Sequence, residues 1–145
     1  MQVSTKFTIA IHILAAASYF GKDYKITSEF LASSIGCNPV IVRNLMKQLK
    51  EAGLISVRRG PGGIEVTRPL DQITFWDVYD AVETSKDQLF NFHDSPNPRC
   101  PVGRNIHKAL DGKLRDIQKQ FEQDLRRHNL AEVVGDLASA IQKES

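Results

Sequence analysis

Apolar residues between positions 27 and 53 recur every three or four residues in two separate runs, a pattern typical of two amphipathic helices. The first helix is expected to begin after Thr27 or Ser28, whose hydroxyls can cap it, and to end at Gly36. The second is expected to begin after Asn38 and to end at Gly53. Because so few residues separate them, the two helices must cross steeply, as in a helix-turn-helix. The apolar positions of the second helix are Val40, Val42, Leu45, Met46, Leu49 and Ala52.

A short alternation of apolar and polar residues follows the second helix and predicts a β-hairpin. Leu54 to Val57 is the first expected strand, and Ile64 to Thr67 is the second, which Pro69 ends. The connecting sequence, Arg58 to Gly63, places two arginines on a glycine-rich backbone, which suits the narrow and negatively charged minor groove of DNA. A phosphate-binding loop or a solvated turn is the alternative interpretation. Together the two helices and the hairpin predict a winged helix-turn-helix.

Apolar runs on either side of this unit predict further helices. Residues 3–20, capped by Ser4 or Thr5, are apolar nearly all round, so this helix is expected at the centre of the fold. A short helix over 75–83, capped by Thr74, follows the hairpin. Residues 84–100 contain many turn-forming residues and are expected to form a regulatory loop.

The longest predicted helix runs from Pro101 to about His128 and carries a narrow apolar stripe that begins at Val102. The spacing of the stripe is close to a heptad repeat. A helix this long cannot bury such a stripe within so small a domain, so we expect it to pair with a second copy of the chain; packing within one chain is the alternative. The expected dimerisation residues are Ile106, Leu110, Leu114, Ile117, Phe121 and Leu125.

These predictions describe a mostly α-helical chain with a small β-hairpin wing. The expected domains are a winged helix-turn-helix over 1–83, a regulatory loop over 84–100 and a helical dimerisation region over 101–145. No signal peptide or membrane span is expected, because the most apolar run, Ile9 to Phe20, is too short to cross a bilayer. Two cysteines are too few for a disulfide framework, which favours a reduced, cytoplasmic protein.

Charge is distributed unevenly along the chain. The net charge is +2, but residues 1–69 hold nine Lys and Arg against four Asp and Glu, whereas residues 70–145 hold ten against thirteen. The basic half contains the helix-turn-helix, as expected for a nucleic-acid-binding face. The basic charge argues against the alternative use of a winged helix, as a protein-interaction module without DNA binding. No paired carboxylates, nucleophile with a base or phosphate-binding loop can be placed, so no enzyme activity is expected.

Polar residues that the core does not need mark the expected DNA contacts. On the second helix of the helix-turn-helix, Arg43 can pair with guanine and Asn44 with adenine, while Lys47 is better placed for phosphates. Thr5 and Lys6 stand at the start of the first helix, where N–H groups and a cation can hold a phosphate. Each could instead be a solvated surface residue. The full set of expected contacts is Thr5, Lys6, Thr27, Ser28, Asn38, Pro39, Arg43, Asn44, Lys47, Arg58, Arg59, Gly60 and Gly62.

Three sequence segments, AGLISVRRGPGG, TRPLDQIT and DVYDAVE, follow the apolar first helix and the helix-turn-helix in an order that resembles the Rrf2 family of bacterial transcription regulators. The resemblance covers nearly the whole chain. It implies a homodimeric transcription regulator, acting as a repressor, that binds a palindromic operator in double-stranded DNA.

The chain departs from the family pattern at two places. After the wing glycines, Ile64 and Glu65 stand where the family usually has a third glycine and an aromatic residue. Members that bind an iron–sulfur cluster place three cysteines before the long helix, whereas this loop contains only Cys100. One thiolate, even with His93 and His107 nearby, is a poor ligand set for a cluster, so neither a cluster nor another metal or cofactor is expected. The segments NPVIVR and NPRCPVG instead resemble the cluster-free, YwnA-like branch of the family.

Cys100 precedes Pro101 and is therefore expected at the start of the long helix, between Arg99 and Arg104. Unpaired N–H groups and nearby cations favour the thiolate form of a cysteine and make it reactive. One hypothesis is that Cys100 senses oxidants or electrophiles, with Cys37 as its resolving partner across the dimer. A purely structural Cys100, a buried Cys37 and control by a small-molecule ligand are the alternatives.

Overall fold

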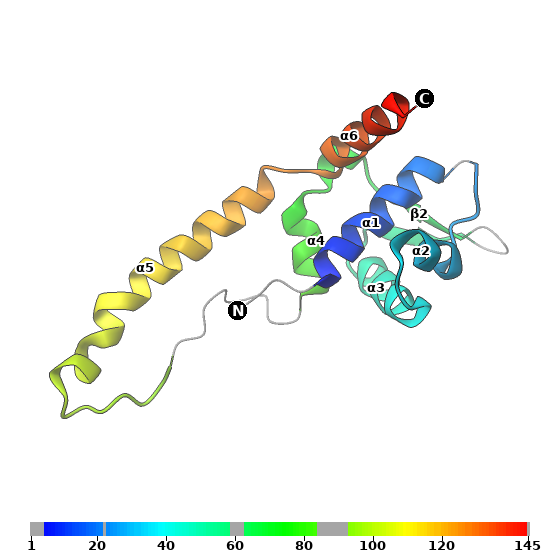
Figure 1. Ribbon diagram of the computed structural model, residues 1–145. Helices are drawn as coiled ribbons and strands as arrows, with labels where there is room; N and C mark the ends of the chain where they lie inside the picture. Colours follow the sequence, from blue (N-terminus) through cyan, green and yellow to red (C-terminus); the bar gives the residue numbers. More distant parts are fainter. Residues whose placement is uncertain (1–4, 22, 59–62, 84–92, 145) are drawn as a thin grey trace.

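The computed structural model describes residues 5–21, 23–58, 63–83 and 93–144. These residues form a mostly helical molecule with a two-stranded antiparallel hairpin, as the sequence predicts (Figure 1). Ser4, residues 59–62 of the wing tip and residues 84–92 of the expected regulatory loop lie outside the described residues. The elements in chain order are α1 (Thr5–Phe20), α2 (Ser28–Ile35), α3 (Pro39–Glu51), β1 (Ile55–Val57), β2 (Ile64–Val66), η1 (Leu70–Gln72), α4 (Phe75–Val82), α5 (Pro101–Arg126) and α6 (Leu130–Lys143).

Side-chain caps fix where α2 and α3 begin. The Thr27 hydroxyl accepts a hydrogen bond from the Phe30 amide at 3.1 Å, and the Asn38 side chain accepts one from the Val40 amide at 2.8 Å. Gly36 ends α2 in the left-handed conformation, with φ of 82°, which a residue without a Cβ adopts at no steric cost. The predicted caps and the predicted turn between the two helices are therefore confirmed.

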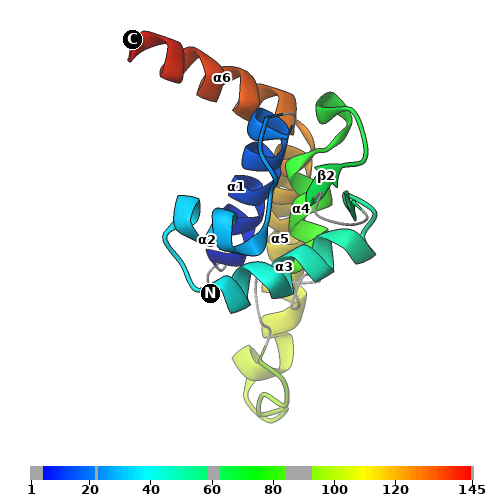
Figure 2. The ribbon, with the colours of Figure 1, turned by 90° about the vertical axis from the view of Figure 1, so that its right-hand side faces the viewer.

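Helix α1 lies at the centre of the fold, as expected from its apolar sequence. Ala10, Ile13 and Leu14 are fully buried. The helix packs against α2, α3, α4, α6 and β2, and Figure 2 shows it between α2 and α4 with α3 in front. A helix with so many neighbours needs apolar residues on nearly every face, and this explains its composition.

The hairpin pairs Ile55 with Val66 and Val57 with Ile64, and each strand is one residue shorter than predicted. Its base is fastened to the segment before α2, because the Ile64 amide donates to the Ile26 carbonyl at 3.1 Å. At Gly63, with φ of 71°, an added Cβ would overlap the backbone of Ile26, so this close approach requires glycine.

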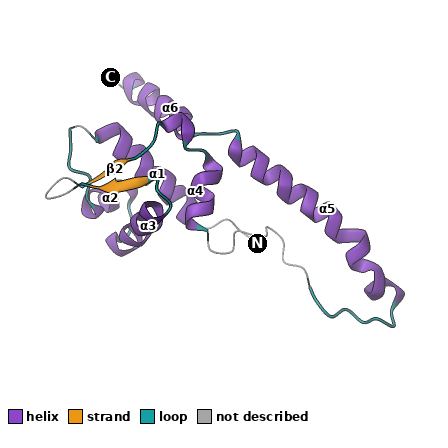
Figure 3. Cartoon of the chain, turned by 180° about the vertical axis from the view of Figure 1, so that it is seen from behind, coloured by secondary structure: helices purple, strands orange, loops and turns teal. Residues whose placement is uncertain are grey.

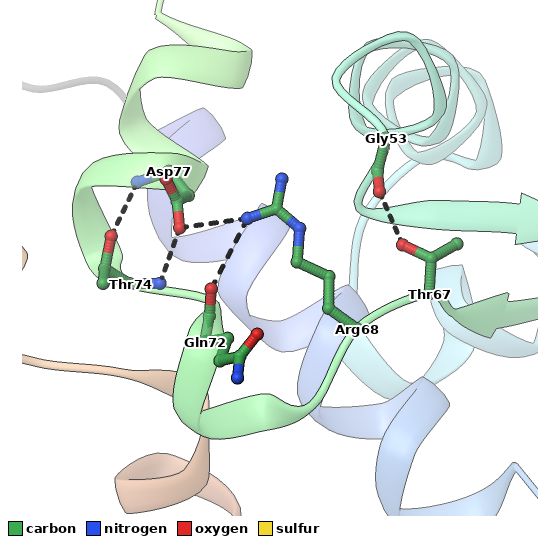
Figure 4. A network of polar contacts seen from close by, with 6 residues as sticks. All are labelled: Gly53, Thr67, Arg68, Gln72, Thr74 and Asp77. Carbon is green, nitrogen blue, oxygen red and sulfur yellow. Dashed lines mark hydrogen bonds and ion pairs between the residues drawn. The ribbon is translucent and has the colours of Figure 1, made fainter.

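A polar network joins the end of the wing to α4 (Figure 4). Thr74 and Asp77 form a capping box: the Asp77 amide donates to the Thr74 hydroxyl at 3.1 Å, and the Thr74 amide donates to the Asp77 carboxylate at 3.0 Å. Arg68 donates to the same carboxylate and to the Gln72 carbonyl, both at 3.4 Å. Thr67 in turn donates to the Gly53 carbonyl at the end of α3. These contacts connect the start of α4 to the segment that follows β2 and to the end of α3.

Helix α5 extends away from the winged-helix body as a long rod (Figures 1 and 3). Its C-terminal part packs against α4, where the Phe121 ring lies edge-on to Tyr79 at 5.5 Å and Arg126 lies 4.9 Å above the ring of Trp76. No residue of α5 is buried, and Ile117 in its apolar stripe is 53% exposed. The stripe of α5 is therefore incompletely covered within one chain.

Helix α6 turns back and packs on α1 and η1. The Leu130 amide donates to the Ile73 carbonyl at 3.0 Å, and the Leu130 side chain is fully buried in the core. The domain scheme drawn from the sequence grouped α6 with the long helix, whereas its packing associates it with the winged-helix body. Among the described residues, no helix is both long and apolar enough to cross a membrane.

Candidate nucleic-acid interface

Helix α3 presents one buried face and one exposed face. Val42, Leu45 and Leu49 are at most 2% exposed and pack into the core. Arg43, Asn44 and Lys47 are exposed on the other side of the helix, as expected for side chains that reach base edges and phosphates. Two of the apolar positions predicted for this helix are wrong: Val40 is 51% exposed, and Ala52 is an exposed residue at the C-cap of α3.

The residues expected at the helix starts take different positions. Asn38 is exposed but uses its side-chain oxygen to cap α3, and Pro39 occupies the first turn, half-buried. Thr27 is half-buried and uses its hydroxyl to cap α2. Ser28 is 9% exposed, and its hydroxyl donates to the Glu29 carboxylate at 3.1 Å. These residues shape the helix starts, whereas Arg43, Asn44 and Lys47 lie further along α3.

The start of α1 lies beside α3, although about forty residues separate them in sequence. Lys6, Asn44 and Lys47 line one open groove of about 400 Å³ between the two helices. Thr5, also exposed, lines a second groove nearby. The structure thus brings the two predicted phosphate-binding elements, the start of α1 and the middle of α3, onto one surface. Two lysines and one glutamate, Glu51, contribute the charges of the first groove, and lysine side chains are suited to phosphate contacts.

Glu29 of α2 forms an ion pair with Arg43 of α3 at 3.6 Å, with both side chains largely exposed. The pKa of Glu29 is held below its usual value by the hydrogen bond from its own backbone amide, then by the Ser28 hydroxyl and the Arg43 charge. Sequence reasoning missed this carboxylate, because an acidic residue in the first turn of a helix is common for reasons of the helix dipole alone.

The described part of the wing contains a second ion pair. Arg58 contacts the Glu65 carboxylate through two nitrogen atoms, both at 3.2 Å. Glu65 is one of the two residues at which the chain departs from the family pattern, and it holds Arg58 against the hairpin. The other wing residues predicted to contact DNA, Arg59, Gly60 and Gly62, lie outside the described residues.

The two cysteines occupy distant parts of the molecule. Cys100 is the exposed N-cap residue of α5, where its side chain forms no capping hydrogen bond. Cys37 is half-buried in the turn between α2 and α3 and lines a groove of about 480 Å³ together with Ile9, His12 and Ile35. The end of α5 next to Cys100 projects away from α2 and α3 in all views (Figures 1, 2 and 3). The two thiols of one chain therefore do not meet in this conformation.

Two histidines lie close together near the start of α5. The rings of His93 and His107 are 5.2 Å apart, and His107 Nδ1 lies 3.0 Å from the Asp111 carboxylate. Within the described ranges, however, no three side chains of His, Cys, Asp or Glu are grouped so that they could hold a metal ion. The donor atoms of this region do not fit an iron–sulfur cluster, which needs four ligands.

Comparisons with protein families, with individual proteins and with solved structures all match this chain to transcriptional regulators or DNA-binding proteins. The family model of Rrf2, described as an iron-dependent transcriptional regulator, matches residues 3–136. YwnA of Bacillus subtilis (strain 168), which carries the name of an HTH-type transcriptional regulator, is 36% identical over 135 residues, covering 93% of this chain and 98% of that protein. A crystal structure described as that of a DNA binding protein is 34% identical, with a TM-score of 0.70 and coverage of 88% of this chain and 97% of that one. IscR of T. potens has a similar fold, with a TM-score of 0.69, 22% identity and coverage of 97% of this chain and 90% of that one.

Proposed function

Because this chain belongs to the Rrf2 family of transcriptional regulators, we propose that it represses transcription as a homodimer bound to a palindromic operator in double-stranded DNA. The family and the related proteins are regulators rather than enzymes. Regulation of transcription in a bacterium takes place in the cytoplasm, which is the compartment we assign to it.

The observation that carries the proposal is the shared surface of α1 and α3. Lys6, Asn44 and Lys47 surround one groove, and Arg43 is exposed on the same helix. If α3 enters the major groove, Arg43 and Asn44 reach base edges while the two lysines lie beside phosphates. The wing then follows the neighbouring minor groove, with Arg58 at its base.

Dimerisation through α5 is supported by the shape of the chain. The helix projects from the body, and its stripe of Ile106, Leu110, Leu114 and Ile117 is only partly covered. A second α5 packed along this stripe would bury it at the spacing of a coiled coil. Two recognition helices related by a two-fold axis would then meet half-sites about one DNA turn apart, roughly 34 Å.

The signal we propose is oxidation of Cys100. Its exposed thiol lies at the start of α5, where a peroxide can reach it. The peroxide transfers one oxygen atom to the thiolate, so that Cys100 becomes a sulfenic acid. The other peroxide oxygen leaves as hydroxide and is protonated to water. Since the thiols of one chain lie far apart, any resolving Cys37 belongs to a second subunit, and that disulfide would release the sulfenic oxygen as water. We propose no iron–sulfur cluster, since the whole chain contains two cysteines.

One binding experiment tests the function. The reduced protein is titrated against the DNA upstream of its own gene, by fluorescence anisotropy, in excess non-specific duplex and at several salt concentrations. We expect competitor-resistant binding whose affinity falls steeply with salt, and a loss of at least tenfold in Arg43→Ala. Absence of DNA binding even at low salt would instead favour a protein-interaction module.

The thiol hypothesis is tested in the same assay. Peroxide should weaken DNA binding of the original protein and leave Cys100→Ser unaffected. The groove beside Cys37 is large enough for a small ligand, and this is the observation that favours control by a metabolite. If Cys100→Ser responds to peroxide as the original protein does, or neither responds, the thiol mechanism is wrong and ligand control becomes the leading explanation.

A further inference from the structure

Val40 is an exposed aliphatic residue on the face of α3 that otherwise carries polar and cationic side chains. It is 51% exposed in the first turn of α3. Residues three, four and seven positions apart lie on one face of a helix, so Val40 shares the outward face with Arg43, Asn44 and Lys47. Its neighbour Ile41, 44% exposed, lines the grooves beside α1 instead.

Isolated apolar residues on a protein surface are common and need no explanation. Val40 differs because polar and cationic side chains flank it on the face that is proposed to enter the major groove. A valine side chain can neither donate nor accept a hydrogen bond, so it cannot read the polar edge of a base. The apolar feature that the major groove offers is the C5-methyl group of thymine.

We propose that Val40 contacts the C5-methyl group of one thymine in each operator half-site and thereby contributes to sequence specificity. This inference rests on the proposed function. It adds the thymine methyl group to the features of the operator that the protein recognises, and polar side chains cannot recognise that group. The N-terminal residues of a recognition helix reach furthest into the groove. Val40 precedes Arg43 and Asn44 by one turn, so the thymine lies within one or two base pairs of the bases that these residues contact. A 5-methylcytosine would present the same methyl group.

The test compares thymine with deoxyuridine, which lacks only the C5-methyl group. Operators are first selected from a random duplex library by the full-length reduced protein. Each thymine is then replaced in turn by deoxyuridine, and binding is measured by anisotropy at low salt. At one position in each half-site, we expect about a fourfold loss of affinity, the effect of exposing one buried methyl group.

The variant Val40→Ala should bind the original operator more weakly and show no further loss with deoxyuridine at that position. Because Val40 is half exposed, its truncation should leave the circular dichroism spectrum and unfolding midpoint unchanged. Ile41→Ala is the matched control, since it truncates a similarly exposed aliphatic side chain in the same turn. It should retain the fourfold preference for thymine.

The outcomes separate this inference from the function on which it rests. If no duplex is selected, the proposed function fails and the inference falls with it. If operators are selected but no thymine shows the preference, or if Val40→Ala retains it in full, only the inference is overturned. Loss of the preference in Ile41→Ala together with its retention in Val40→Ala would also overturn it.

Discussion

The Arg43 guanidinium on the recognition helix lies 3.6 Å from the Glu29 carboxylate on α2. A residue that we propose to contact a base is therefore already paired in the free protein. DNA binding must separate this pair or bring the negative charge of Glu29 close to the phosphates, and either event opposes binding.

We accordingly predict that Glu29→Gln binds DNA more tightly than the original protein. Because water screens an exposed ion pair strongly, removing it should raise the affinity for DNA by only a few-fold. Anisotropy titrations at fixed salt measure the change. Asp71→Asn, which removes an exposed carboxylate from η1, is the control for a general loss of negative charge. An equal gain in both variants would show that the Arg43 pair has no special role.

Asp77 should matter more for stability than Arg68. Asp77 completes the capping box of α4 and also accepts a hydrogen bond from Arg68, whereas removal of the Arg68 side chain leaves the cap intact. We predict that Asp77→Ala lowers the free energy of unfolding by about 1–2 kcal/mol and Arg68→Ala by about 0.5 kcal/mol. Urea denaturation measures both, with the exposed Asp71→Ala as control. The reverse order would contradict the network in Figure 4.

His12 should make stability depend on pH. Burial lowers the pKa of this histidine, and its Nε2 lies 3.0 Å from the Ser34 hydroxyl. The unfolded chain then binds a proton more readily than the folded chain, so stability is lost as pH falls below about 6.5, the usual pKa of histidine. Between pH 8 and pH 5.5, the free energy of unfolding should fall more in the original protein than in His12→Gln. Parallel pH profiles would exclude this role.

Substitution of Ile117 tests the proposed homodimer. Ile117 is 53% exposed within one chain and lies in the middle of the apolar stripe of α5. Ile117→Glu places a charge in the proposed interface and should convert the dimer into a monomer, with a loss of operator affinity of at least tenfold. Sedimentation velocity measures the mass, and Lys119→Gln on another face of α5 is the control. A variant that stays dimeric would place the interface elsewhere.

Local chemistry explains which parts of the fold could be predicted from the sequence. The starts of α2, α3 and α4 each depend on one capping side chain, Thr27, Asn38 and Thr74, so a short sequence is sufficient to identify them. Val40 was misassigned because apolar spacing alone does not distinguish the first exposed turn of a helix from its buried continuation. Its exposure is decided by where α1 and α2 pack against α3.

The candidate site was only partly predictable for the same reason. Arg43, Asn44 and Lys47 follow from the periodicity of a single helix. The pairing of Arg43 with Glu29, and the groove that Lys6 shares with Asn44, depend on contacts between helices that the local pattern does not encode. Likewise, the amphipathic character of α6 predicts a helix but does not identify α1 as the element it packs against.

Within the described part of the chain, the C-terminal end of α5 packs against α4, and its N-terminal end lies far from this contact. At 1.5 Å per residue, about 30 Å of helix separates Phe121 from Pro101. Each degree by which α5 rotates about its contact with α4 therefore displaces the Cys100 end by roughly half an ångström. A rotation of α5 that carried α4 with it would also move the Arg68 side chain, because Arg68 contacts Asp77 of α4, and Arg68 lies at the base of the wing.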